Sequence, residues 1–192
     1  VSSSSFVNLA DLNGPSTAAA ARNITLSGAV TGNGTLTIDS NNTVSAGNQL
    51  EGTLSISSAA STWSGNLIFN RGTVNIDATA SAIFSPANIT FNSFGRILYK
   101  GVDARTINRA GTLTLAAAAV GEIQIDNTTG TQATDFVINQ NGAVSLGAGS
   151  ALRISLADTF AKFNIVGGVT LGGAGSISAS NNAAYLATIS GV

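Results

Sequence analysis

Apolar and polar residues alternate in a short phrase that recurs along the chain. Each copy begins with Gly and a small polar residue, and its apolar positions then alternate with polar ones. Period-two alternation is typical of a β-strand with one buried face, so the phrase predicts strands whose Leu, Ile and Val side chains point into a core. The clearest copies are Gly34-Thr35-Leu36-Thr37-Ile38, Gly52-Thr53-Leu54-Ser55-Ile56, Gly72-Thr73-Val74-Asn75-Ile76 and Gly111-Thr112-Leu113-Thr114-Leu115.

The spacing of these copies indicates a repeat architecture. The first three begin at residues 34, 52 and 72, which are 18 and 20 residues apart, and the fourth follows 39 residues later. Looser copies begin at Gly121, Gly142 and Gly175. Strands that recur at a nearly fixed spacing are typical of stacked coils. At roughly 20 residues per coil and ~4.8 Å per rung, we expect eight or nine coils in a rod about 40 Å long.

The predicted fold class is therefore all-β, a parallel β-helix (β-solenoid) over residues 23–192. Residues 1–22 contain a serine run and the turn signal Asn13-Gly14-Pro15, and we expect them to form a short N-terminal arm or cap. A β-sandwich, which also has strands at regular spacing, is the alternative. The repeated Gly-Thr phrase favours the solenoid, because a sandwich does not need the same motif at successive strands.

Residues 93–110 interrupt the pattern and hold four of the eight basic residues of the chain. We expect an irregular rung or a protruding loop with solvated charges. The functional alternative is a patch for an acidic glycan or a protein partner. A nucleic-acid site is not expected, since the rest of the chain supplies no supporting basic stripe. The residues of this partner patch are Arg96, Lys100, Arg105 and Arg109.

Composition narrows the chemistry. The chain has no Cys and no His, which removes thiolate and imidazole nucleophiles and the commonest metal ligands, so we expect no catalytic residues, no metal and no cofactor. Charged residues make up 9% of the chain, against roughly 25% in ordinary domains. The net charge of −1 gives no general attraction to nucleic acid or to anionic membranes.

The ends and the hydropathy of the chain add two expectations. No apolar run reaches the ~18 residues of a membrane-spanning helix, so no membrane span is expected. The chain lacks Met, and we expect Val1 to begin a processed chain or an excised fragment. The single tryptophan, Trp63, is expected to be a packed side chain rather than a platform for a sugar.

Three aspartates leave an enzymatic alternative open. Asp39, Asp77 and Asp126 each stand five residues after the Gly of a phrase, so aligned phrases would place them on one edge of the rod. Asp39 and Asp77 would then be two coils, or ~10 Å, apart. The carboxylates of an inverting glycosidase are ~6.5–9.5 Å apart. We expect these residues to bond turn backbone instead. An ice-binding role for the outward Thr pairs is a further alternative, although several other residue types interrupt the array.

The phrases Gly-Thr-Leu-Thr-Ile-Asp and Gly-Thr-Val-Asn-Ile-Asp, in a chain rich in Asn, Gly, Ser, Thr and Ala and poor in charge, resemble autotransporter passenger domains and related bacterial β-helical surface adhesins. The resemblance covers about residues 23–180 and is one of composition and period. It implies a right-handed parallel β-helix, export from the cell and a role at the bacterial cell surface. It brings no shared catalytic residues to this sequence.

The predicted function is that of a noncatalytic extracellular structural or adhesive protein, with self-assembly into surface fibres as one form of that role. A glycan or a host-surface molecule is the expected ligand, and a polysaccharide-degrading β-helix enzyme is the alternative function. Open strand edges favour pairing between copies, and the uncharged C-terminal segment has no Pro to block it. The residues expected to associate are Tyr185, Leu186, Ile189 and Val192.

Overall fold

The structure of the chain is a computed structural model, and it describes residues 5–8, 23–39, 52–58, 60–77, 86–100, 105–126, 135–157, 160–181 and 187–189. The regular structure of these residues is entirely β, which confirms the predicted fold class. The strands are β1 (Ser5–Asn8), β2 (Asn23–Leu26), β3 (Thr35–Asp39), β4 (Thr53–Ile56), β5 (Asn66–Ile76), β6 (Ile89–Lys100), β7 (Arg105–Arg109), β8 (Leu113–Leu115), β9 (Val120–Asp126), β10 (Phe136–Gln140), β11 (Val144–Leu146), β12 (Ala151–Leu156), β13 (Ala161–Ile165), β14 (Val169–Leu171), β15 (Ser176–Asn181) and β16 (Ala187–Ile189).

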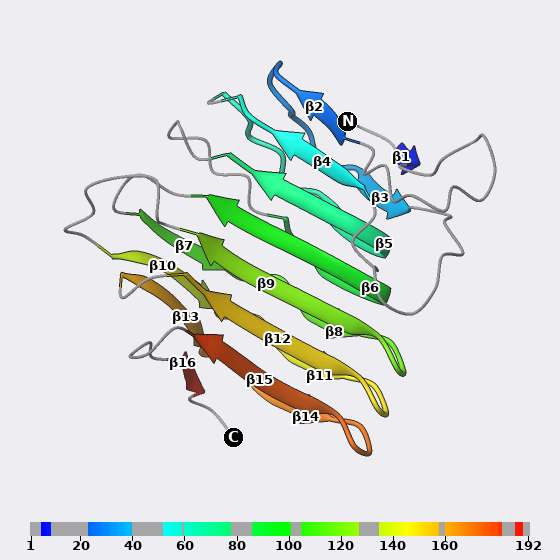
Figure 1. Cartoon of the computed structure of the whole chain (residues 1–192), viewed down its shortest axis with the longest axis vertical. Helices are drawn as coiled ribbons and strands as arrows, with labels where there is room; N and C mark the ends of the chain where they lie inside the picture. The colour runs from blue at the N-terminus through cyan, green and yellow to red at the C-terminus, as the bar shows by residue number, and fades with distance from the viewer. Residues whose placement is uncertain are drawn as a thin grey trace.

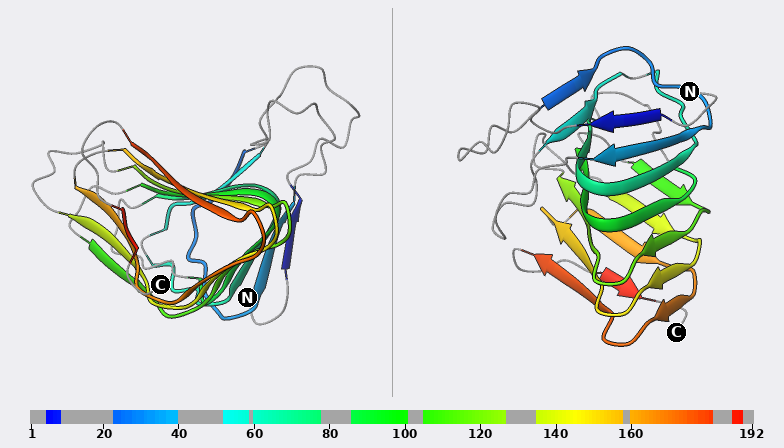
Figure 2. Two further views of the ribbon diagram at one scale, coloured as in Figure 1. Left: turned by 90° about the horizontal axis from the view of Figure 1, so that it is seen from below. Right: turned by 90° about the vertical axis from the view of Figure 1, so that its right-hand side faces the viewer.

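The strands form three faces that the chain visits in turn, and neighbouring strands are parallel (Figure 1). The first face has the order β1-β3-β5-β6-β8-β11-β14, and the third has the order β7-β10-β13-β16. The second face holds β2, β4, β9, β12 and β15 together with the C-terminal halves of β5 and β6. Figure 2 shows successive coils superimposed around a common interior. This pairing is the one expected of a parallel β-helix.

The coils are longer and more variable than the sequence predicts. Thr53 pairs with Thr73, an offset of 20 residues, whereas Thr35 pairs with Asn66, an offset of 31. The copies that begin at residues 34 and 52 are not one coil apart, because β3 lies on the first face and β4 on the second. Among the described strands the first face has seven rungs rather than eight or nine. Seven rungs span about 29 Å at ~4.8 Å each.

The described part of residues 93–110 does not form the irregular rung or protruding loop that the sequence predicts. Most of them belong to β6, one of the longest strands, and to β7 on the third face. Within β6, Ile97 and Tyr99 are buried, and Arg96 and Leu98, which alternate with them, are only partly exposed. The segment therefore keeps strand alternation, and Arg96 occupies a position that holds Thr or Asn in the earlier coils.

The core is a stack of apolar columns, one for each inward position of the strands. Trp63 is 1% exposed, which confirms that it is a packed side chain. The predicted inward positions are all confirmed, with exposures between 0% and 6%: Leu36, Ile38, Leu54, Ile56, Val74, Ile76, Leu113 and Leu115.

The chain turns from the first face to the second in two ways. In β5 and β6 it bends without leaving the strand, and Gly72 and Gly95 lie in register at the bend. In later coils a four-residue turn makes the corner, and in the first of these Ala119 N donates to Ala116 O at 3.1 Å. The small residues 116–119 thus form a corner of the coil. The third residue of each turn has a positive φ: 58° at Ala118, 69° at Gly149 and 57° at Ala174.

An aromatic stack fills the bend of the earlier coils. The rings of Phe69 and Phe91 have centroids 4.9 Å apart and planes 14° apart. A Cβ atom on Gly95 would lie 2.6 Å from Cβ of Phe69, and one on Gly121 would lie 2.5 Å from Cδ2 of Phe91. The missing side chains at these two positions therefore make room for the stack.

Asparagine side chains connect successive coils on the outside of the stack. On the third face, Nδ2 of Asn139 donates to Oδ1 of Asn108, and Nδ2 of Asn164 donates to Oδ1 of Asn139, both at 2.8 Å. On the first face, Nδ2 of Asn88 donates to Oδ1 of Asn66 at 2.8 Å. In each bond the amide of the later coil donates to the earlier one.

Candidate functional site

The four basic residues of the predicted partner patch do not form one surface. Arg96 and Lys100 lie at outward positions of β6 on the second face. Arg105 and Arg109 belong to β7 on the third face. A corner of the coil separates the two pairs, so the patch as predicted is wrong.

Arg109 is also in the wrong place for surface binding, because it is only 1% exposed. Its Nη1 donates to Oε1 of Gln140, and its Nη2 donates to the carbonyl oxygen of Pro86 at 3.4 Å. Burial lowers the pKa of Arg109 and raises the pKa of Tyr99. Arg109 is thus a buried polar link between coils. The alternation within β7, which puts Ile107 and Arg109 on the same side, is the sequence signal for this position.

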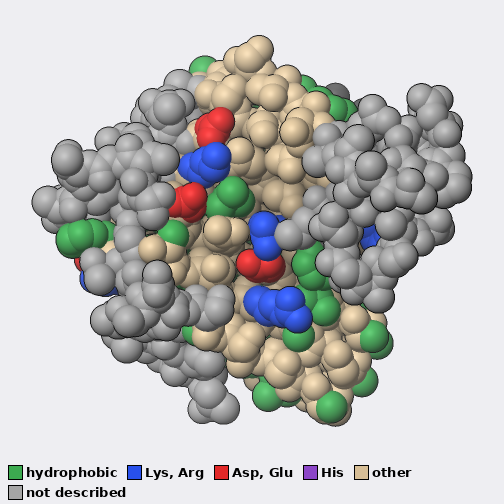
Figure 3. Space-filling view, in the orientation of Figure 1, with side chains coloured by type: hydrophobic (Ala, Val, Ile, Leu, Met, Phe, Trp, Pro, Cys, Tyr) green, Lys and Arg blue, Asp and Glu red, His purple; other side chains and the backbone are tan. Residues whose placement is uncertain are grey.

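Acidic residues match the basic ones on the second face. Nη2 of Arg96 lies 2.8 Å from Oε2 of Glu122, and Arg153 follows Glu122 in register on the next strand. Lys100 is in register with Asp126. Figure 3, which views this face, shows acidic and basic side chains interspersed across its middle. A surface with both signs of charge does not attract an acidic partner as a purely basic patch would.

The three aspartates are not on one edge of the rod. Asp39 ends β3 on the first face, where its Oδ2 accepts a hydrogen bond from Nδ2 of Asn70 at 3.1 Å. Asp77 and Asp126 both lie at the end of second-face strands, two rungs apart, with Lys100 on the rung between them. The predicted alignment fails for Asp39 because its copy of the phrase occupies a different face.

A trough of about 430 Å³ lies on the second face, on the N-terminal side of the alternating charges. Two outward side chains from each of four successive strands, β2, β4, β5 and β6, line it. The side chains form two columns in register: Asn23, Thr53, Thr73 and Arg96 in one, and Thr25, Ser55, Asn75 and Leu98 in the other.

The side chains from β5 are the most buried of the eight. Thr73 is 6% exposed and Asn75 is 9% exposed. Nδ2 of Asn75 lies 3.5 Å from Oγ of Ser55, a long hydrogen bond, and Oδ1 of Asn75 is buried without a partner in the described part of the chain. Nε of Arg96 is in the same state. Because buried polar atoms are nearly always hydrogen-bonded, these two atoms distinguish the trough from the rest of the face.

The sequence did not single out this trough. The alternation correctly predicts that Thr73 and Asn75 point away from the core, since Val74 and Ile76 between and beside them are buried. The depth of the trough depends on surrounding structure that a two-residue period does not encode.

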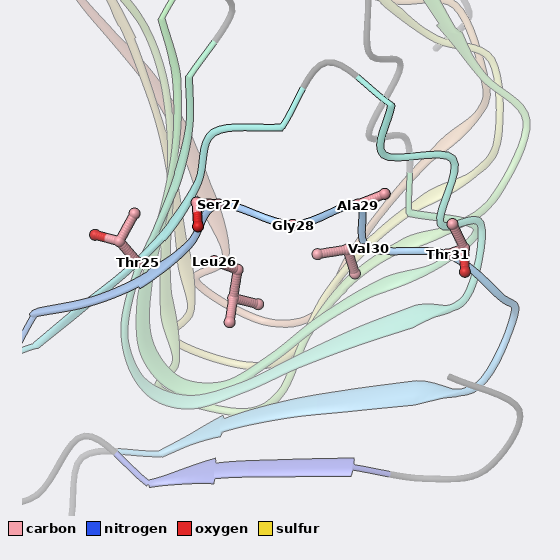
Figure 4. A pocket seen from close by; sticks show the side chains of 7 residues that line it. All are labelled: Thr25, Leu26, Ser27, Gly28, Ala29, Val30 and Thr31. Atoms are coloured by element: carbon pink, nitrogen blue, oxygen red, sulfur yellow. The ribbon is translucent and has the colours of Figure 1, made fainter.

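A second hollow, of about 490 Å³, lies inside the arc formed by residues 25–31 of the first full coil. Figure 4 shows the side chains of Leu26 and Val30 pointing into this arc, whereas those of Thr25 and Thr31 point away from it. Leu26 and Val30 pack against the core and are only partly buried. The hollow is therefore the N-terminal mouth of the apolar interior.

The opposite end of the described stack is also uncovered. Leu171, the last residue of β14, is 58% exposed, although Leu146 and Leu115 in the same column are 2% and 1% exposed. Of the residues predicted to associate, Ile189 ends β16 in register with Ile165. Tyr185, Leu186 and Val192 lie outside the described residues.

Comparisons of the chain with protein-family models, with curated proteins and with solved structures find no match. Within the ranges that the structure describes, no three acidic side chains come together in a way that would hold a metal ion. None of the described residues forms a helix with the length and hydropathy needed to cross a membrane.

Proposed function

We propose that this chain is a noncatalytic protein with a structural or adhesive role outside the cell or on the bacterial cell surface. The observation that carries the proposal is the second face. Seven parallel rungs present hydroxyl and amide side chains, and charges of alternating sign, on one continuous surface. A repeat scaffold of this kind offers an extended surface for contact.

The arrangement of acids argues against the enzymatic alternative. Asp77 and Asp126 are two rungs, or about 9.6 Å, apart at ~4.8 Å per rung. This separation is at the wide limit for an inverting pair, which is ~6.5–9.5 Å. In addition, Lys100 occupies the rung between them, where a glycosidase would place the bond to be cleaved.

The test measures adhesion and turnover together. The purified, fluorescently labelled chain is applied to immobilised glycans, collagen and fibronectin, and the size of each glycan is measured after incubation. We expect saturable retention on at least one surface and no change in glycan size. Shortening of a glycan that stops in the Asp77→Asn and Asp126→Asn variants would contradict the proposal, and so would the absence of retention on every surface.

We further propose that copies associate end to end, which would give the structural form of this role. Support comes from the two ends of the core: Leu171 is 58% exposed at one end, and Ile24 is 39% exposed in the column where Leu54 is 0% exposed. Exposed ends of apolar columns next to open parallel strands favour pairing with another strand. The low charge of the chain provides little repulsion against it.

Light scattering tests this association. We expect the measured mass of the intact chain to rise with concentration. We expect the Leu171→Lys variant to have a mass closer to that of the monomer. Thr170→Lys is the matched control, because Thr170 is the exposed neighbour of Leu171 on the same strand. A strictly monomeric wild-type chain at high concentration would refute the association.

A further inference from the structure

We infer that the trough on the second face is a binding site for a neutral oligosaccharide. The inference rests on the proposed adhesive function and names the ligand class of that function. It starts from the floor of the trough, where Thr73 and Asn75 are 6% and 9% exposed although both point away from the core.

The hydrogen-bonding capacity of the floor is not used up by the residues that the structure describes. Oδ1 of Asn75 and Nε of Arg96 are buried and have no partner among the described residues, so the floor of the trough holds one acceptor and one donor whose hydrogen bonds are not made. The hydroxyl groups of Thr53, Ser55 and Thr73 both donate and accept. A ligand that completes this set must itself carry several groups able to donate and accept, as the hydroxyl groups of a sugar do.

The charge of the trough selects against ions. No carboxylate is among the described residues that line the trough, and carboxylate oxygens are ligands that calcium and magnesium prefer. Arg96, the one cation among these described lining residues, already lies 2.8 Å from the carboxylate of Glu122. Since that charge is neutralised, an acidic ligand gains little Coulomb attraction, and the site fits a neutral one.

The shape of the trough fits a short chain of sugar units. The lining spans four rungs, or about 14 Å at ~4.8 Å per rung, along the axis of the stack. Hydroxyl and amide side chains recur on the first three rungs, so successive units of an oligosaccharide would meet similar partners there. Leu98 at the last of these rungs supplies an apolar surface for the C–H face of one sugar ring.

Titration with neutral trisaccharides tests the site. Maltotriose, cellotriose and tri-N-acetylchitotriose are titrated into the whole chain, and binding is followed by calorimetry and by chemical-shift changes. We expect at least one to bind saturably, and Asn75→Leu to weaken that binding by about tenfold, as the loss of a buried hydrogen bond predicts. The variant should fold, because it replaces a buried amide, which makes only a long hydrogen bond to Ser55 among the described residues, by an apolar group of similar size.

Gln124→Leu is the matched control. Gln124 lies in the same column as Asn75, two rungs away and outside the trough, and should be replaced without effect on binding. Equal weakening by the two variants would overturn the site, as would failure of all three trisaccharides to bind. Tighter binding of the acidic tri-galacturonate than of any neutral sugar would overturn the assignment of ligand class.

The outcomes separate this inference from the proposed function. If Asn75→Leu abolishes trisaccharide binding but the protein shortens the sugar, the site stands and the noncatalytic proposal falls. If the chain adheres to surfaces as strongly with Asn75→Leu as without it, the adhesive proposal stands and the trough is not its site.

Discussion

The early coils, from β2 to β6, and the later coils, from β7 to β15, share one apolar core but turn the chain differently. In β5 and β6 of the early coils the strand bends around a stack of Phe69 and Phe91, and the described part of the third side is irregular backbone in which Thr62 N donates to Val30 O at 2.9 Å. In the later coils a third face of strands is present, and each corner is a compact four-residue turn. The early corners thus depend on contacts between coils, whereas the later corners depend on local backbone geometry.

The core should show no difference between the halves, and a charge placed in it should have the largest effect. Leu54 and Ile154 lie in one column, in the early and later coils, and are 0% and 1% exposed. We expect Leu54→Asp and Ile154→Asp each to cost about 4 kcal/mol or more, because each buries an unpaired carboxylate. Chemical denaturation measures the loss.

Ser155→Asp is the control for this pair, since Ser155 follows Ile154 and faces outward. It should change the free energy of unfolding by less than ~0.5 kcal/mol. A small effect of either core substitution would mean that the two halves do not share a continuous core.

A substitution of glycine by alanine should destabilise the early coils more than the later coils, and Gly95→Ala tests the early coils. Its Cβ would lie 2.6 Å from Phe69, so the aromatic stack or the strand must shift, at a cost of ~3 kcal/mol. Gly173→Ala, at a corner of the later coils, meets no heavy atom within 4 Å and should be nearly neutral. Thermal unfolding measures the loss of stability in each of the two variants. Equal losses would show that the bend of the early coils has no special dependence on Gly95.

The pH dependence of stability tests the burial of Tyr99, which lies in β6 at the boundary between the early and the later coils. Burial raises its pKa above 10.0, so above pH 10 the unfolded chain releases a proton that the folded chain keeps. The stabilisation that comes from Tyr99 should be fully present below pH 10. Above pH 10 the free energy of unfolding should fall by up to ~1.4 kcal/mol per pH unit until the pKa of Tyr99 in the folded protein is reached.

Tyr99→Phe removes this titrating group, and a comparison of unfolding curves between pH 8 and pH 11 isolates its contribution. At pH 7 the variant should be at least as stable as the wild type, because the Tyr99 hydroxyl is buried without a partner in the described structure. An identical fall in stability above pH 10 in both proteins would contradict the assignment.

The smallest effect is expected at a corner of the later coils. Ala118 has φ of 58°, a left-handed conformation that favours glycine. Ala118→Gly should raise the free energy of unfolding by up to ~1 kcal/mol. Ala117→Gly, at the preceding position of the same turn, should lower it by ~0.5–1 kcal/mol through chain entropy. The opposite order of stabilities, measured by thermal unfolding, would show that the left-handed residue is not strained.

The direction of side chains could be predicted from the sequence, but the face on which a strand lies could not. Alternation is local, and it predicts that Leu36 and Leu113 point into the core without any knowledge of the partner strand. Asp39 and Asp77 follow the same phrase yet lie on different faces, because the length of the intervening chain decides which side of the coil a strand joins. The same limit explains the error in coil length.

The candidate sites depend on how residues far apart in the sequence are arranged in space. The four basic residues of the predicted patch are near one another in sequence, and a corner of the coil separates them in space. Arg109 is two residues after Ile107, so its side chain lies on the same side of the strand. This alternation alone could have assigned Arg109 to the interior. The burial of Asn75 has no such signal, since Thr and Asn at outward positions are common along the chain.

The asparagine ladders have a consequence for how such a chain lengthens. Each described amide-to-amide bond runs from the later coil to the earlier one, as in Asn164 to Asn139 and Asn139 to Asn108. A ladder of this kind therefore has a donor side and an acceptor side that differ. Gene duplication that inserts one more coil with its asparagine preserves this order automatically, because the new amide accepts from its successor and donates to its predecessor. The ladder thus allows the length of the protein to change by whole coils during evolution while each junction stays the same.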